Sequence, residues 1–172
     1  MRNLCWALIA IFLATFLSSC VEGKYIEMPE NVVPLHKGDA DALSRVVWAE
    51  ARSESFEGQS AIVWVIINRL RREQGRFPNT IQGIIRQPYA FSCFNTNDPQ
   101  CARVKVIDER DPAFVEAMHV VTSVVTGRVP NPIGSADHYF LTSMRHAPAW
   151  AGKMTLVKRL GSHSFFSELP VK

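Results

Sequence analysis

The side chain best placed to do chemistry in this sequence is Glu50, because it interrupts an apolar stripe. One face of a predicted helix carries apolar residues at i, i+3 and i+4: Leu43, Val46, Val47. Glu50 follows at i+7, where burial would raise its pKa and keep it protonated near neutral pH. A general acid that cleaves a glycosidic bond needs this state. The alternative is a structural ion pair between Glu50 and Arg52 or Arg69.

Two more carboxylates follow on the same face, Glu54 at i+4 and Glu57 at i+7. We expect the helix to break before Glu57, because serines and a glycine within residues 53–58 favour a turn. Glu57 then falls in the first turn of the next helix, where it complements the helix dipole. Glu54 is interpreted as solvated or as a neighbour of Arg52. Of the three, only Glu50 occupies a position that is costly without a reason.

The rest of the chain predicts helices first and short strands later. Beyond the first helix, which begins near Asp39 or Asp41, we expect helices at 59–72, 81–86 and 112–126, and strands at 136–141, 156–160 and 163–166. The helix at 59–72 is apolar nearly all round, which indicates a central core element. Residues 89–94 are aromatic and β-prone, and would bring Phe91 and Ser92 to a surface.

Three polar or aromatic features have two interpretations each. Asn68 enters the buried face of the second helix, where it could bond Glu50 or substrate, or cap backbone groups. Trp150 lies in a predicted loop, where it could stack on a sugar face or fill the core. His138, His146 and His163 could converge on zinc, but an HExxH motif and paired i, i+4 histidines are absent.

Composition fits one soluble domain. The chain has 172 residues, 47% hydrophobic and 20% charged, with a formal net charge of +3. Loss of a leader containing Arg2 would lower this charge to +2. Such a mildly basic chain suits a polyanionic surface such as a cell wall, and its charge is too weak and scattered to indicate nucleic acid.

The first twenty residues are typical of an export signal. Arg2 precedes an apolar core at 4–17, and the segment ends in Leu-Ser-Ser-Cys at Cys20, as in a bacterial lipobox. We therefore predict a lipoprotein signal peptide at 1–20, a tether at 21–39 and a folded domain at 40–172. An uncleaved anchor helix or a plain secretory signal is the alternative. Val21 after Cys20 would favour the outer membrane in a Gram-negative host, with the protein facing the periplasm.

Export also changes how the cysteines are interpreted. With Cys20 as the lipid site, Cys93 and Cys101 are left as a pair outside the leader. In an oxidising compartment we expect them to form a disulfide that closes the loop 94–100. A metal site is the weaker alternative, because CxxC spacing is missing and no histidine lies nearby in the sequence.

A set of short motifs runs in order from residue 43 to 166: Ala49-Glu50-Ala51-Arg52-x-Glu54, Glu57-Gly58-Gln59-x-Ala61, Val65, Asn68-Arg69, Phe77-Pro78, Phe91-Ser92, His138-Tyr139, Pro148-x-Trp150 and Gly161-x-His163-x-Phe165. In this combination the sequence resembles the SleB/CwlJ family of cell wall hydrolases, the spore-cortex lytic enzyme type. One departure is Asp137, where the family commonly has Thr. The resemblance implies a helix-rich, lysozyme- or lytic-transglycosylase-like α+β fold with a small antiparallel sheet, and a peptidoglycan-cleaving activity with Glu50 as catalytic acid.

The resemblance also implies a reaction type. Ordinary glycosidases use two carboxylates roughly 5–10 Å apart, and only Glu57 and Asp137 are candidates for the second. We therefore expect a lytic transglycosylase, in which the muramic acid's own C6 hydroxyl attacks the anomeric carbon. A muramidase, a zinc-dependent amidase and a non-catalytic wall-binding lipoprotein are the alternatives. The expected substrate-binding residues are Asn68, Arg69, Ser92, His138, Tyr139 and Trp150. We expect a monomer without a cofactor, with peptidoglycan strands as its partner.

Overall fold

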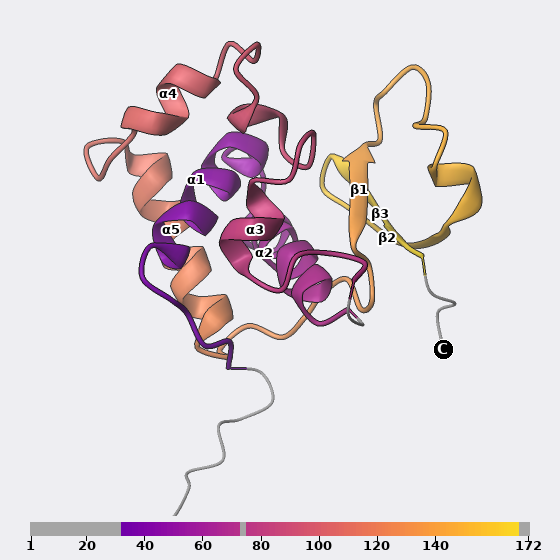
Figure 1. Cartoon of the computed structure of the whole chain (residues 1–172), viewed down its shortest axis with the longest axis horizontal. Helices are drawn as coiled ribbons and strands as arrows, with labels where there is room; N and C mark the ends of the chain where they lie inside the picture. Colours follow the sequence, from indigo (N-terminus) through magenta and orange to yellow (C-terminus); the bar gives the residue numbers. More distant parts are fainter. Residues whose placement is uncertain (1–31, 73–74, 169–172) are drawn as a thin grey trace, which may run out of the picture.

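The computed structural model describes residues 32–72 and 75–168, which form a helical part and a small sheet (Figure 1). The helical part contains α1 (Asp39–Ala51), α2 (Phe56–Leu70), α3 (Ile81–Ile85), the 3-10 helix η1 (Ser92–Phe94), α4 (Cys101–Val106) and α5 (Pro112–Val125). The C-terminal part contains β1 (His138–Leu141), the 3-10 helix η2 (Ala151–Lys153), β2 (Thr155–Leu160) and β3 (His163–Ser167). This is the α+β arrangement predicted from the sequence.

The core is built around α2, whose residues 61–67 are all buried. Both α1 and α5 pack against it. Side-chain caps fix where α2 and α5 begin. The Ser55 hydroxyl accepts from the Gly58 N–H at the start of α2, and the Asp111 carboxylate accepts from the Ala113 N–H, next to Pro112, at the start of α5. The Ser55 cap explains why α2 begins three residues earlier than predicted. An apolar helix enclosed by two others gives the helical part a closely packed centre.

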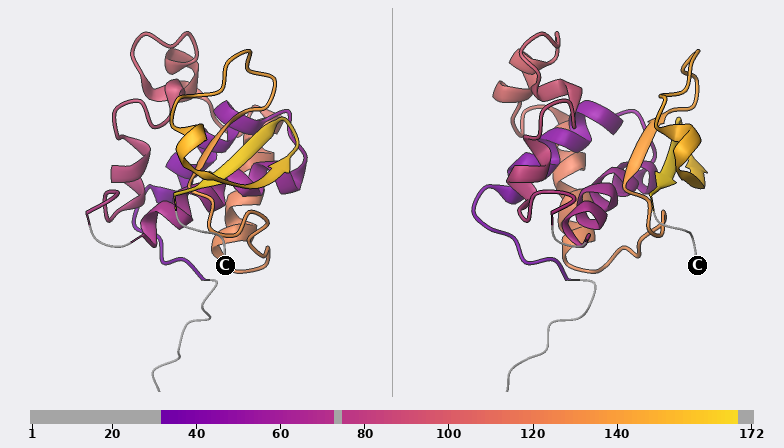
Figure 2. Two further views of the ribbon diagram at one scale, coloured as in Figure 1. Left: turned by 90° about the vertical axis from the view of Figure 1, so that its right-hand side faces the viewer. Right: turned by 45° about the vertical axis from the view of Figure 1, so that its right-hand side comes forward.

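The sheet has three antiparallel strands in the order β1-β3-β2. The central strand β3 is buried along its whole length. Tyr139 on β1 is opposite Phe165 on β3, and Leu141 is opposite His163. The sheet lies beside the helices on the side of α2 (Figures 1 and 2).

Polar contacts at the C-terminal end of α2 hold the sheet in place. The Asn68 side-chain amide donates to the carbonyls of Gly134 and Ala136, at 2.8 and 2.7 Å. Arg69 Nε donates to the carbonyl of Asp137 at 2.7 Å, and Arg72 Nε donates to the Asp137 carboxylate at 2.7 Å. These bonds fix the segment that enters β1, and with it the position of every side chain on that strand.

A second contact joins the sheet to the α1–α2 turn. The Glu54 carboxylate accepts from the Ser162 N–H at 3.2 Å, and its side chain is only 9% exposed. Gly161 has a φ of +55°, and a Cβ there would lie 1.9 Å from Glu54 Oε2. Only glycine therefore allows this close approach. Glu54, interpreted from the sequence as solvated, instead anchors the β2–β3 hairpin.

The structure also differs from the sequence predictions at residues 89–94, at α4 and at the start of the folded part. Residues 89–94 form a turn and the 3-10 helix η1 where a strand-like segment was expected, and α4 was not predicted. Val33 is 6% exposed and its N–H donates to Val125, so the end of the predicted tether 21–39 belongs to the folded part. Residues 1–20, with Cys20, lie outside the described residues. Within 32–72 and 75–168, no helix is long and apolar enough to cross a membrane.

Candidate active site

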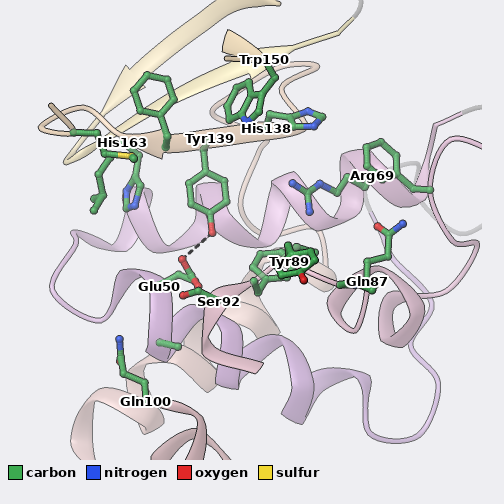
Figure 3. Close-up of a pocket in the computed structure, with 18 of the residues that line it drawn as sticks. Glu50, Arg69, Gln87, Tyr89, Ser92, Gln100, His138, Tyr139, Trp150 and His163 are labelled. Atoms are coloured by element: carbon green, nitrogen blue, oxygen red, sulfur yellow. Dashed lines mark hydrogen bonds between the residues drawn. The ribbon is translucent and has the colours of Figure 1, made fainter. Parts of the chain in front are cut away.

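Glu50 lies in the last turn of α1 and faces a groove of about 810 Å³ between the helices and the sheet. Its Oε2 accepts a hydrogen bond from the Tyr139 hydroxyl at 3.1 Å (Figure 3). Tyr139 comes from β1, on the opposite wall of the groove. The contact therefore joins the two parts of the molecule at the candidate acid.

Burial raises the pKa of Glu50 above its ordinary value, and the negative charge of Asp98 raises it further. Hydrogen bonds from Tyr139 and from the Cys93 thiol oppose the rise without reversing it. Glu50 has no ion pair among the described residues. Neither arginine proposed as an ion-pair partner bonds Glu50: Arg52 donates to Trp48, Ala49 and Gln100, and Arg69 donates through Nε to the Asp137 carbonyl. The local environment thus favours a protonated carboxyl group, as a general acid requires.

Tyr139 is held as a fixed donor to this carboxyl. Its ring packs edge-on against His163, with centroids 5.3 Å apart, and against Phe165 at 5.9 Å. Burial raises its pKa well above the ordinary value, and the nearby Glu50 charge adds to the effect. The phenol therefore stays protonated and keeps its hydrogen available to Glu50.

An aromatic wall continues along the sheet side of the groove. Trp150 is partly buried, with its ring centroid 5.2 Å from His138 and 5.8 Å from Phe140. His138 in turn lies 6.1 Å from Phe77 across the groove. Such an arrangement of rings beside polar groups suits the faces of sugar rings.

Most of the predicted substrate-binding residues do line the groove: Arg69, Ser92, His138, Tyr139 and Trp150. Asn68 does not, and the prediction for it needs correction. Its amide nitrogen is bound by Gly134 and Ala136, and its oxygen accepts from Asn131. Because all its polar atoms are engaged there, Asn68 positions the chain before β1 and does not contact the groove.

Glu50 is the only acidic residue among the described residues that line the groove. Neither candidate for a second carboxylate lies there. Glu57 is exposed and pairs with Lys158 at 3.1 Å. Asp137 is fully buried and its two oxygens bind Arg72 and His138. Asp98, which the sequence did not single out, is the charge that acts on Glu50 from outside the lining.

The predicted disulfide is not formed in the structure, where Cys93 and Cys101 are free and buried. The loop between them is closed by backbone hydrogen bonds instead, from Asp98 N to Asn95 O and from Cys101 N to Asp98 O, both 3.0 Å. Burial, together with the charge of Glu50, raises the pKa of Cys93 to about 12. Cys93 is therefore a neutral thiol beside the acid, a role that its sequence position did not indicate.

The three histidines considered as zinc ligands do not form one cluster in the described part of the chain. His138 and His163 face the groove from different strands, and His146 is in an exposed loop. In the part of the chain that the structure describes, no three His, Cys, Asp or Glu residues are grouped closely enough to hold a metal ion.

Residues 53–166 match the family described as Cell Wall Hydrolase. The chain belongs to this family. Glu50 lies just before the matched range, in the helix that leads into it. Two similar curated relatives are named spore cortex-lytic enzyme. The one from Bacillus subtilis is 32% identical over 127 residues, which are 74% of this chain and 37% of the relative. The one from Oceanobacillus iheyensis is 30% identical over 129 residues, 75% and 41% of the two chains.

Solved structures show the same fold. The catalytic domain of the Bacillus cereus SleB protein is 26% identical, with a TM-score of 0.63, covering 81% of this chain and 98% of that domain. The catalytic domain of SleB from Bacillus anthracis, titled a germination-specific lytic transglycosylase, is 27% identical with a TM-score of 0.62, covering 78% and 100%. This cell wall hydrolase is thus an enzyme with a lysozyme-like catalytic domain, and it spans about two fifths of the length of the curated relatives above.

Proposed function

We propose that this enzyme cleaves the glycan strand of peptidoglycan between N-acetylmuramic acid and N-acetylglucosamine, as a lytic transglycosylase with Glu50 as its single acid. The observation that carries the proposal is that Glu50 is the one carboxyl among the described groove-lining residues, with a raised pKa and no cation beside it. The names of the similar proteins, a spore cortex-lytic enzyme and a lytic transglycosylase, support the substrate and the reaction class.

The reaction uses the carboxyl group of Glu50 twice, first as an acid and then as a base. Glu50 gives its proton to the glycosidic oxygen as the bond from C1 of muramic acid to that oxygen breaks, and N-acetylglucosamine leaves with a free hydroxyl. The Glu50 carboxylate then takes the proton of the C6 hydroxyl of the same muramic acid, whose oxygen bonds to C1. The product is an anhydromuramyl end, Glu50 is protonated again, and no water is consumed.

Tyr139 suits this exchange because its hydroxyl can donate to Glu50 Oε2 throughout. The bond strengthens when Glu50 becomes a carboxylate, since hydrogen bonds to charged acceptors are the stronger ones. Burial favours the acid form before proton transfer, and Tyr139 steadies the base form after it. Together they suit a carboxyl that must serve in both states at one pH.

The proposal is tested with Glu50→Gln, which keeps the shape of the side chain and removes the titrating proton. We expect a native circular dichroism spectrum and a loss of more than about 1,000-fold in the release of soluble muropeptides, since one group provides both acid and base catalysis. The matched control is Glu57→Gln, which removes an exposed carboxylate paired with Lys158 and should leave activity unchanged. A folded, active Glu50→Gln protein would refute the role of Glu50.

Mass spectrometry of the wild-type digest identifies the reaction. Anhydromuramyl ends are the expected product. Reducing muramic acid ends would instead indicate attack by water, and freed stem peptides would indicate an amidase. Binding to peptidoglycan without any soluble product would contradict enzymatic cleavage altogether.

We also propose that the enzyme acts outside the cytoplasm, where peptidoglycan lies. The leader at 1–20, its lipidation at Cys20 and an outer-membrane location stay predictions from the sequence, because those residues lie outside the described part of the chain.

A further inference from the structure

Arg69 presents an unusual cation to the groove. It lies in the last turn of α2 and is 7% exposed. Its Nε is fixed by the Asp137 carbonyl at 2.7 Å, and its guanidinium lies 5.4 Å from the ring centroids of both Phe77 and Phe91. Three contacts thus hold the plane of the guanidinium in one orientation, while its side chain lines the groove.

The two terminal nitrogens of Arg69 have no hydrogen bond or ion pair within the described residues. The nearest buried acid, Asp137, gives its carboxylate oxygens to Arg72 and His138 instead. Burial lowers the pKa of Arg69, and the nearby charges of Tyr139 and Asp137 oppose this without reversing it. A buried cation without an anionic partner is costly, and the two ring contacts offset only part of that cost. Arg69 is therefore arranged for an anion that the protein does not supply.

The two ends of the groove differ in charge. On one side of Glu50 lie Arg69 and His138, and on the other lie Gln100 and His163 (Figure 3). Arg76 also lines the groove, but its guanidinium is already paired with Glu168. Among the described lining residues, Arg69 is thus the arginine without a carboxylate partner.

The two sugars of the glycan strand differ in one chemical group that a guanidinium can recognise. N-acetylmuramic acid differs from N-acetylglucosamine by a lactyl ether, whose carboxyl is either free or joined to the stem peptide. A guanidinium fork binds the two oxygens of a free lactyl carboxylate in one plane, and a sugar hydroxyl, an acetamide or a lactyl group joined to a stem peptide as an amide does not offer that pattern. The sugars alternate along the strand, so reading one of them fixes which glycosidic bond faces Glu50.

We propose that Arg69 is the specificity-determining residue of the groove, and that its terminal nitrogens bind the lactyl carboxyl of muramic acid. This inference rests on the proposed function for the identity of the glycan. Arg69 selects the register of the strand, whereas Glu50 performs the chemistry. Binding should accordingly depend on the lactyl group even where no bond is cleaved.

The test is calorimetry on the full chain carrying Glu50→Gln, so that no turnover occurs. One ligand is a tetrasaccharide of alternating N-acetylglucosamine and N-acetylmuramic acid with free lactyl carboxylates. The other is chitotetraose, which has no lactyl group. We expect the first to bind roughly 10- to 100-fold more tightly, the range for a charged hydrogen-bonded contact. Adding Arg69→Lys, which keeps the charge but loses the fork, should reduce this ratio, and Arg69→Gln should abolish it with chitotetraose affinity unchanged.

Arg110→Gln is the matched control, because it removes an exposed cation that pairs with Asp108 outside the groove. It should leave the ratio intact. If Arg69→Gln fails to fold, the ligand is changed instead: reducing the lactyl carboxyls to alcohols should weaken binding to the unaltered Arg69 protein by the same factor. Equal binding of the two tetrasaccharides, equal binding after reduction, or no binding of either would overturn the inference. The proposed function is judged separately, from the digest products and the activity of Glu50→Gln alone.

Discussion

Two carboxyl groups, Glu50 in the lining of the groove and Asp137 buried outside it, have opposite environments. Glu50 on α1 has no ion pair within residues 32–72 and 75–168, and burial raises its pKa. Asp137, next to β1, is buried more completely, so burial acts to raise its pKa too, but hydrogen bonds from His138 and Arg72 outweigh that effect and lower the pKa. The difference teaches that burial alone does not decide the charge state of a carboxyl group. The partner decides it, and with it the role.

The two groups should also affect stability with opposite dependence on pH. For Glu50 the folded pKa is raised, so the folded protein binds more protons than the unfolded chain between the two pKa values. The stability due to Glu50 is therefore present at low pH and lost as pH rises through the folded pKa. For Asp137 the folded pKa is lowered. Its stability is present above the unfolded pKa and lost as pH falls through the folded pKa.

The largest expected effect on stability comes from removing the charge of Asp137, which is paired with Arg72. Asp137→Asn would leave Arg72, whose side chain is 11% exposed, without its carboxylate. We expect a loss of about 3 kcal/mol in the free energy of unfolding at pH 7, the lower end for breaking a buried pair. Urea unfolding followed by circular dichroism measures this loss. It should shrink as the pH is lowered through the folded pKa of Asp137.

Asp108→Asn is the control, because it breaks an ion pair between two exposed residues, Asp108 and Arg110. Its unfolding midpoint should match that of the wild type. If Asp137→Asn lowers the free energy of unfolding as much in acid as at pH 7, the charge of the Asp137 carboxylate does not stabilise the contact between Arg72 and the segment that enters β1.

A smaller effect is expected from replacing Tyr139, the hydrogen-bond donor to Glu50. Tyr139→Phe removes the hydroxyl that donates to Glu50 and keeps the ring against His163 and Phe165. We expect kcat/KM to fall about 10-fold, as for one hydrogen bond of roughly 1.4 kcal/mol. Because that bond lowers the pKa of Glu50, its loss should move the basic limb of the pH profile to higher pH. A fall in rate with an unmoved limb would show that Tyr139 acts on the substrate and not on Glu50.

The comparison also shows what the sequence could reveal about the fold. Apolar periodicity predicted α1, α2 and α5, because a long helix that buries one face or all faces carries apolar residues in a regular pattern along the chain. It could not predict α4, which is only six residues long, or the turn at residues 89–94. Aromatic residues there suggested a strand, but the segment is fixed by turns and by η1. Short segments of this kind depend on tertiary contacts more than on propensity.

The sequence predicted the acid and most of the residues that line the groove, but not which residues act on the acid. Glu50 was identified because a carboxyl breaks an apolar stripe on its own helix. Its partners Tyr139 and Asp98 come from segments 89 and 48 residues away, and no local spacing connects them to Glu50. Asn68 was misjudged for the same reason. A polar residue entering a buried face must find partners, but the sequence does not tell whether they are substrate or the backbone of residues 134 and 136.

The smallest expected effect concerns Asp98, whose charge raises the pKa of Glu50. Asp98→Asn removes that charge while an amide oxygen can still accept from the Gln100 N–H, now bonded at 2.8 Å. The pKa of Glu50 should fall, so the basic limb should move to lower pH, opposite to Tyr139→Phe, with a rate at neutral pH reduced only about 2- to 3-fold. The double variant with Tyr139→Phe and Asp98→Asn should have its basic limb at a pH between those of the two single variants. A loss beyond about 100-fold, together with reducing muramic acid ends in the wild-type digest, would instead make Asp98 the second carboxylate of a hydrolase. Glu50 would then not act as a single acid, and its contrast with Asp137 would no longer explain the chemistry.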